Sequence, residues 1–131
     1  MLEVGLQMTI SEKVTPQNTA AALGCGGLEV YATPAMALLM EKTCYLCAQG
    51  GLEDGFTTVG TALDIQHLSA TPVSMEVVCA CTLTAVDGRA LQFEVTCSDA
   101  AGVIGRGVHS RFVVDGAKFA ARARSKAGGQ A

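Results

Sequence analysis

The sequence predicts an α+β domain in which an antiparallel sheet curls around one long helix. The first indication is a run from Thr33 to Gln49 that is apolar on nearly every side. Such a helix must be covered by other structure. The second is that four strand-like segments follow it, and the third is that Asp87-Gly88 and Ala101-Gly102 form natural hairpin turns between the last three.

The segments before this run predict a strand, a short helical turn and a hinge. Residues 2–14 alternate in polarity until Thr15-Pro16 ends the pattern. The apolar side chains on one face of this strand are Val4, Leu6, Met8 and Ile10. Residues 17–23 favour a helical turn, and the glycines within residues 24–27 leave the backbone few constraints, which predicts a hinge or lid.

The central helix has recognisable start and stop signals. Thr33 is suited to be its N-cap, and Pro34 is suited to the first helical position. Gly50-Gly51 supplies a stop. Strands are expected at residues 57–67, 74–86, 90–98 and 103–114, the last three forming a meander. Residues 116–131 have lost the alternation, and we expect a partly flexible C-terminal tail.

The bulk composition limits the classes of function. The 131 residues are expected to form one domain, 1–131. Half of them are hydrophobic and 16% are charged, which predicts that some apolar surface is buried in an oligomer. The net charge of −3 argues against nucleic acid, and the only cationic run, between Lys118 and Lys126, is interpreted as a solvated tail. Without a membrane span or leader pattern, we expect a cytoplasmic protein.

The six cysteines are expected to be reduced, small hydrophobic side chains. The alternative is a metal site, because Cys44-x-x-Cys47 and Cys79-x-Cys81 each place two sulfurs on one face of an element. Nothing in the sequence shows that these pairs meet, and a zinc-binding CxxC is usually found in a turn. No metal and no cofactor are therefore predicted.

Three polar residues in otherwise apolar surroundings are candidates for chemistry: Thr33, Glu41 and His67. A hydroxyl, a carboxylate and an imidazole are the groups needed for acyl transfer or for activating water. Each also has a structural interpretation: Thr33 as a helix cap, Glu41 as a side chain that reaches solvent, and His67 as a hydrogen-bonded histidine at a strand end. The eight residues from Thr33 to Glu41 span about 12 Å of helix axis, too far for contact. Antiparallel helices of two subunits would bring them together, which predicts a composite site in a dimer.

The arrangement as a whole resembles the hot-dog fold and, more closely, the fluoroacetyl-CoA thioesterase family. The similar motifs are residues 32–36 with Glu41, Val59-Gly60-Thr61 leading to His67-Leu68, residues 70–73, and residues 107–115. The resemblance covers about residues 14–119. It implies an acyl-CoA substrate, subunits paired side by side, and catalytic roles for Thr33, Glu41 and His67. It also places Gly60 beside the bound thioester, and it leaves open whether two dimers associate further.

Two further residues each have two interpretations. Gly60 is interpreted as a bulge or a point of close ligand approach, and the resemblance favours substrate binding. Arg111 shares a strand face with His109, and it is either a ligand for a CoA phosphate or a solvated charge on an edge strand.

The sequence departs from the family at the lid. The fluoroacetyl-specific enzyme has an aromatic lid before the catalytic helix, whereas residues 23–28 contain no aromatic side chain. The resemblance therefore implies hydrolysis of small or medium acyl-CoA thioesters in general. The main alternative is a non-catalytic acyl-CoA-binding protein of the same fold. A hydratase is a further alternative, but the Asp and His pair of a hydratase motif is not found.

Overall fold

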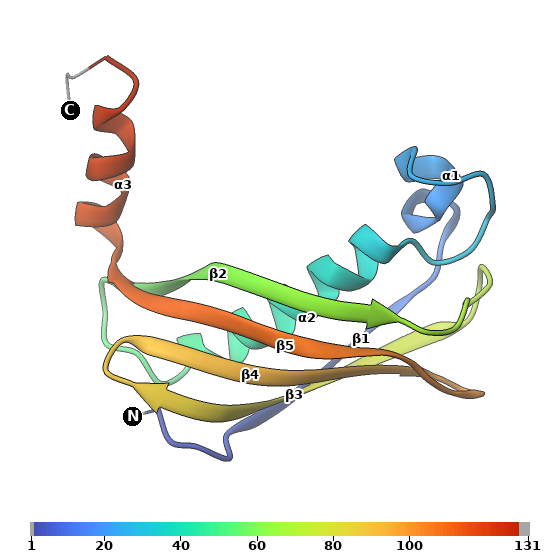
Figure 1. Ribbon diagram of the computed structural model, residues 1–131, viewed down its shortest axis with the longest axis horizontal. Helices are drawn as coiled ribbons and strands as arrows, with labels where there is room; N and C mark the ends of the chain where they lie inside the picture. The colour runs from blue at the N-terminus through green and yellow to red at the C-terminus, as the bar shows by residue number, and fades with distance from the viewer. Residues whose placement is uncertain (1, 129–131) are drawn as a thin grey trace.

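The computed structural model describes residues 2–128. In chain order, the elements are β1 (Gln7–Lys13), the single-turn helix η1 (Pro16–Asn18), α1 (Ala20–Leu23), α2 (Thr33–Gln49), β2 (Phe56–His67), β3 (Glu76–Asp87), β4 (Ala90–Asp99), β5 (Gly102–Asp115) and α3 (Gly116–Ser125). The five strands form one antiparallel sheet in the order β1-β3-β4-β5-β2. Figure 1 shows α2 crossing one face of this curved sheet.

Strict alternation in β3 and β4 produces the sheet side of the core. The buried residues of β3 are Val77, Cys79, Cys81 and Leu83, and those of β4 are Leu91, Phe93, Val95 and Cys97. α2 packs against them through residues such as Met36, Leu39 and Met40. Gly105 of β5 lets the helix approach closely, because a Cβ there would lie 2.6 Å from Met36 Sδ. The helix position is therefore fixed by packing at its first turn.

The predicted helix and strands agree closely with the structure, and the β3–β4–β5 meander turns at Gly88 and Gly102, both of which have positive φ. Residues 17–23 hold most of η1 and α1. The first strand is shorter than expected, since it begins at Gln7, and Val4 and Leu6 before it are exposed.

One expectation about the helices is met only in part, and another is wrong. α2 is buried on only one side in this chain, and its other side exposes Leu38 (64%), Tyr45 (37%) and Leu46 (38%). The segment that begins at residue 116 is not a tail but the helix α3, capped by the Asp115 side chain, which accepts a hydrogen bond from the Lys118 N–H. The expected fraying of the last residues falls on 129–131, outside the described part of the chain.

Five of the six cysteines are buried, as expected of small hydrophobic residues, and only Cys25 is exposed. Within residues 2–128, no group of three or more His, Cys, Asp or Glu side chains is placed to hold a metal ion. No helix in the same range is long and apolar enough to span a membrane.

Candidate active site

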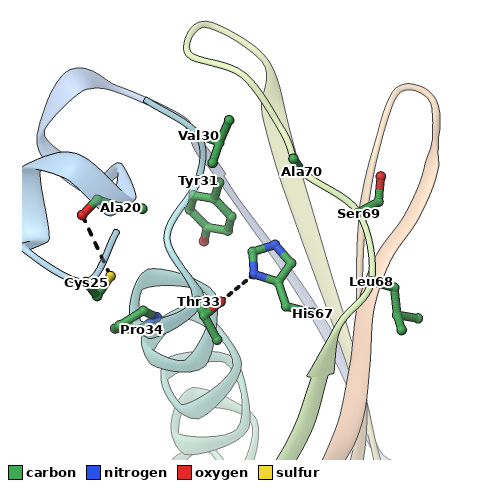
Figure 2. A pocket seen from close by; sticks show the side chains of 10 residues that line it. All are labelled: Ala20, Cys25, Val30, Tyr31, Thr33, Pro34, His67, Leu68, Ser69 and Ala70. Carbon is green, nitrogen blue, oxygen red and sulfur yellow. Dashed lines mark hydrogen bonds between the residues drawn. The ribbon is translucent and has the colours of Figure 1, made fainter. Parts of the chain in front are cut away.

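The first half of the candidate site is the pair formed by Thr33 and His67. Ala32, not Thr33, is the N-cap of α2, and it makes no side-chain capping bond, so the predicted cap is wrong by one residue. Thr33 is the first helical residue, and its hydroxyl is free to contact another element. Its Oγ1 lies 2.8 Å from His67 Nδ1 (Figure 2). The sequence-predicted hydroxyl and imidazole therefore meet within one chain.

His67 is held at the end of β2 by its surroundings. The next residue donates a backbone hydrogen bond of 2.7 Å to the Ile104 carbonyl, which anchors the chain as it leaves the strand. The Tyr31 ring packs edge-on against the imidazole, with 6.5 Å between ring centroids and an interplanar angle of 81°. Tyr31 is itself fixed because its hydroxyl donates to the Glu12 carboxylate. These contacts fix the plane of the imidazole.

The environment of His67 favours the neutral ring. Desolvation by burial lowers the pKa of His67 below its ordinary value of 6.5, and a weaker interaction with the Ser69 backbone opposes this shift. Its Nε2 is buried and has no hydrogen-bond partner among the described residues. A neutral imidazole whose Nδ1 is unprotonated accepts the Thr33 hydroxyl proton. His67 is therefore suited to act as a base toward that hydroxyl.

A pocket of ≈ 360 Å³ opens beside this pair. Side chains from α1, the loop before α2 and the loop after β2 line it (Figure 2): they include Cys25, Val30, Tyr31, Leu68 and Ala70. The volume is at the small end of the about 300–1,000 Å³ typical of small-ligand sites. The first-turn N–H groups of α2 lack helical partners and favour negative charge nearby. This pocket can therefore hold a small acyl group with its carbonyl at the helix start.

The second half of the site surrounds Glu41, two turns further along α2. Glu41 Oε2 lies 3.6 Å from Arg111 Nη1, and the Glu41 side chain is 43% exposed. His109 Nε2 is 3.9 Å from the same oxygen, but burial and the neighbouring Arg111 lower the pKa of His109, so this contact is between a carboxylate and a neutral ring. Glu41 is thus a half-exposed carboxylate beside one cation.

A buried hydrogen-bond network aims Arg111 at Glu41. The Arg111 Nε donates to Thr58 Oγ1 at 2.7 Å and Nη2 donates to the Thr58 carbonyl at 3.0 Å. His109 Nδ1 is 2.8 Å from the Ala62 carbonyl, to which it donates, so its Nε2 is free to accept from Arg111 Nη1 at 3.0 Å. The Tyr45 ring covers the guanidinium at 5.7 Å. All three nitrogens of the guanidinium are therefore hydrogen-bonded to protein groups, and Nη1 also faces Glu41.

This network corrects one interpretation of Arg111. β5 lies between β4 and β2, and Arg111 is 6% exposed, so it is not a solvated charge on an edge strand. Sequence reasoning missed Thr58 and gave no role to His109. The alternation that places His109 and Arg111 on one face was visible, but nothing marked that face as the inner one.

Gly60 is required by a close approach. A Cβ at this position would overlap Glu41 Oε2 and would lie 3.2 Å from His109 Cε1. The pairing of β2 with β5 also shifts register between Gly60 and Ala62, which agrees with the bulge interpretation, whereas contact of Gly60 with a ligand stays a prediction. Gly60 therefore makes room for the carboxylate at the surface of the sheet.

The two halves remain separate in one chain. Among the hydrogen bonds and ion pairs of residues 2–128, none joins Glu41 to Thr33 or His67. One end of α2 has a hydroxyl and an imidazole beside a pocket, and its middle has a carboxylate held by an arginine.

The motifs of the chain match a known protein family. The family model for FlK, described as fluoroacetyl-CoA-specific thioesterase, matches residues 14–117. The chain belongs to this family. A curated fluoroacetyl-CoA thioesterase from Streptantibioticus cattleyicolor is 39% identical over 98 residues, which are 75% of this chain and 70% of that protein.

Solved structures of the same family have the same fold. A point mutant of the fluoroacetyl-CoA-specific thioesterase FlK superposes with a TM-score of 0.90 at 34% identity, covering 96% of this chain and 98% of that one. Another FlK variant, in complex with acetyl-CoA, gives a TM-score of 0.90 at 34% identity over 95% and 98% of the two chains. A thioesterase superfamily member from Thermus thermophilus gives 0.88 at 25% identity over 95% and 92%. The predictions of a hot-dog fold and of a thioester hydrolase are confirmed.

Proposed function

We propose that the chain is a homodimeric hydrolase of small or medium acyl-CoA thioesters, with each active site shared between two subunits. Thr33 and His67 of one subunit would face Glu41 and Gly60 of the other. The observation that carries this proposal is the division of the site along α2, because each half lacks the groups that the other half has. Membership of a thioesterase family supports the chemistry.

Two surfaces support the pairing of subunits. Within the described residues, β2 is an edge strand that pairs only with β5, so its outer backbone groups are available to a second copy. The exposed side of α2 presents Leu38 and Tyr45 near that edge. A two-fold axis at this edge would pair β2 with its copy and set the two α2 helices antiparallel, which moves Glu41 of one subunit toward Thr33 of the other.

The proposed reaction uses each half for one task. The thioester carbonyl lies at the start of α2, where the helix N–H groups stabilise the negative oxygen of the tetrahedral intermediate. The Thr33 hydroxyl adds a further donor in the tautomer in which His67 Nδ1 carries the proton and donates to Thr33 Oγ1. The Glu41 carboxylate takes a proton from water as the water oxygen bonds to the carbonyl carbon. The C–S bond then breaks, CoA leaves as a thiolate and the free acid forms. His67 orients the Thr33 hydroxyl through Nδ1 and exchanges protons with it.

The acyl preference follows from the pocket and the lid. Cys25 and Val30 line the pocket where an aromatic lid is absent, and the buried Tyr31 faces His67 rather than covering the entrance. We therefore expect hydrolysis of acetyl-CoA and somewhat longer acyl-CoAs, without selection for fluoroacetyl-CoA. A cytoplasmic location stays a prediction.

Complementation between inactive variants tests the composite site. Thr33→Ala and Glu41→Gln are each expected to lower kcat/KM for acetyl-CoA by about 100-fold or more. If subunits of the two variants are mixed and allowed to exchange, a heterodimer keeps one site with both Thr33 and Glu41 intact. Random exchange should restore about one quarter of wild-type activity, since about half the dimers are heterodimers with one intact site each.

A site contained in one chain predicts no recovery, because every subunit of the mixture would be defective. The control is to mix Thr33→Ala with His67→Ala, since both residues belong to the same half and no intact site can form. Tight binding of acetyl-CoA without any turnover by the wild-type protein would favour the binding-protein alternative.

A further inference from the structure

A second hollow, of ≈ 190 Å³, lies between α3, the end of β5 and the β3–β4 turn. Its lining includes Arg89, Phe112, Lys118, Phe119 and Arg122. Two of these are aromatic rings left in contact with water, since Phe112 is 41% exposed and Phe119 is 40% exposed. The combination of exposed aromatic faces and cations is unusual in a chain that is so sparsely charged.

The sequence of α3 directs these groups to one side. Asp115, Lys118, Phe119 and Arg122 have the spacing of one helical face, and all four line the hollow. Across from them, the Arg89 guanidinium lies 5.8 Å from the centre of the Phe56 ring, which holds this side chain over the sheet. No residue of α3 is buried. This helix face therefore has no role in the core.

The hollow is locally positive although the chain is acidic. The net charge is −3, yet three of the nine Lys and Arg residues line this one surface. The only carboxylate in the lining, Asp115, accepts the Lys118 backbone N–H at 3.1 Å and so is engaged as the helix cap. A ligand with several negative charges is complementary to this surface.

We propose that this hollow binds the phosphorylated adenosine end of coenzyme A, an assignment that rests on the proposed acyl-CoA substrate. The cations pair with the phosphate groups, and the Phe112 and Phe119 rings contact the adenine. The volume is below the about 300–1,000 Å³ of sites that enclose a whole small ligand, so it suits one end of a long molecule. Arg111, the sequence-based candidate for a CoA phosphate, is buried beside Glu41 and does not reach solvent.

The position of α3 is consistent with this role in the proposed dimer. The helix starts beside the first residues of β2, since Gly116 N–H donates to the Gly55 carbonyl at 2.9 Å, and Figure 1 shows it rising past the free β2 edge. Antiparallel pairing of two β2 strands sets the start of one opposite the end of the other, where His67 lies. α3 of one subunit thus approaches the pocket entrance of its partner, and the pantetheine arm joins the two.

Steady-state kinetics with a whole and a truncated substrate test this assignment. Arg89→Gln, Lys118→Gln and Arg122→Gln are each expected to raise the KM for acetyl-CoA about threefold to fivefold, as befits exposed charges, and more than tenfold in combination. The kcat should not change. Hydrolysis of acetyl-pantetheine, which lacks the nucleotide, should not change either. Arg124→Gln is the matched control, because Arg124 is in α3 but outside the hollow.

A binding measurement separates this proposal from the proposed function. Adenosine 3′,5′-bisphosphate should bind the wild-type protein in calorimetry, more weakly as salt is added, and should not bind the triple variant. This readout needs no turnover, so a chain that binds the nucleotide but hydrolyses nothing would overturn the hydrolase and keep the nucleotide site. Three outcomes overturn the site: no binding by the wild type, equal KM effects on both substrates, or dissociation of the dimer in the variants, which would assign this face of α3 to the subunit interface.

Discussion

The two polar regions of α2 differ in how their side chains are held. At the helix start, Thr33 and His67 form a neutral pair beside a pocket, and no ion pair within residues 2–128 involves the imidazole. Two turns further along, Glu41 faces a guanidinium that Thr58 and His109 hold in place. One region therefore places a neutral base beside a pocket, and the other places a half-exposed carboxylate beside a cation.

This difference supports the proposal that the active site is divided between two subunits. A carboxylate beside His67 in the same chain would raise the pKa of the imidazole, whereas here desolvation lowers it. A second chain can bring the carboxylate and the imidazole together only when the site assembles. Family membership supports the chemistry, and the contrast between the two regions makes its dependence on assembly testable.

The largest loss of activity is expected from a substitution that displaces the Glu41 carboxylate without removing it. Gly60→Ala places a Cβ against Glu41 Oε2, so the half-exposed carboxylate must move away from the sheet. We expect kcat/KM to fall by about 100-fold, because displacements of about 1 Å have effects of this size.

Gly105→Ala is the matched control for this substitution. A Cβ at residue 105 would meet the Met36 side chain at the other region of the helix, 2.6 Å from Sδ. It should lower the melting temperature through overpacking while leaving Glu41 in place. A Gly60→Ala variant that loses stability but keeps its kcat/KM would show that Gly60 has only a packing role.

A smaller effect is expected from removing the cation that faces Glu41. Arg111→Met keeps an apolar stem but leaves Thr58 and His109 without their buried donor, which should cost about 2–3 kcal/mol of unfolding free energy in urea titrations. The direct attraction to Glu41 contributes little to this figure, since that side chain is 43% exposed. We expect kcat to fall about tenfold with KM nearly unchanged.

Arg111→Lys is the informative companion. It retains the charge but not the forked geometry that reaches Thr58 and His109. If orientation of Glu41 is what matters, the lysine variant should resemble the methionine variant in kcat. Full activity in the lysine variant would reduce the role of Arg111 to charge alone.

The sequence contained most of the fold because the strands alternate so regularly. In β4, for example, Leu91, Phe93 and Val95 are buried and the residues between them are not. The helix cap at Thr33 was predicted wrongly because the partner of its hydroxyl, His67, is 34 residues away in sequence. α3 was missed because its cations resemble a solvated tail, although Asp115 followed by alanines is a local helix signal.

The network around Arg111 could not be predicted for a different reason. Alternation places His109 and Arg111 on one face of β5, but which face is inner depends on how α2 lies across the sheet. Hydrogen bonds from Arg111 to Thr58 also join residues that are 53 positions apart. Long-range pairing of this kind leaves no local pattern in the sequence. The candidate residues Thr33, Glu41 and His67 could therefore be recognised from the sequence, but the residues that hold them in place could not.

The smallest expected effects are on the pKa values of the two histidines. They test most directly whether the two regions of α2 meet. Burial lowers the pKa of both His67 and His109 below 6.5 in the single chain. In the pH window below 6.5, the unfolded chain binds protons that the folded chain does not, so the unfolding free energy should fall as pH falls. In an assembled composite site, Glu41 of the partner would raise the pKa of His67, as Glu41 of the same chain partly raises that of His109. NMR titration of the two rings should therefore show that Glu41→Gln lowers the pKa of His67. The acid limb of the pH profile of kcat/KM for acetyl-CoA, measured on the residual activity of this variant, should move to lower pH with it. A shift confined to His109, 3.9 Å from Glu41 in its own chain, would instead mean that the two regions of α2 never meet.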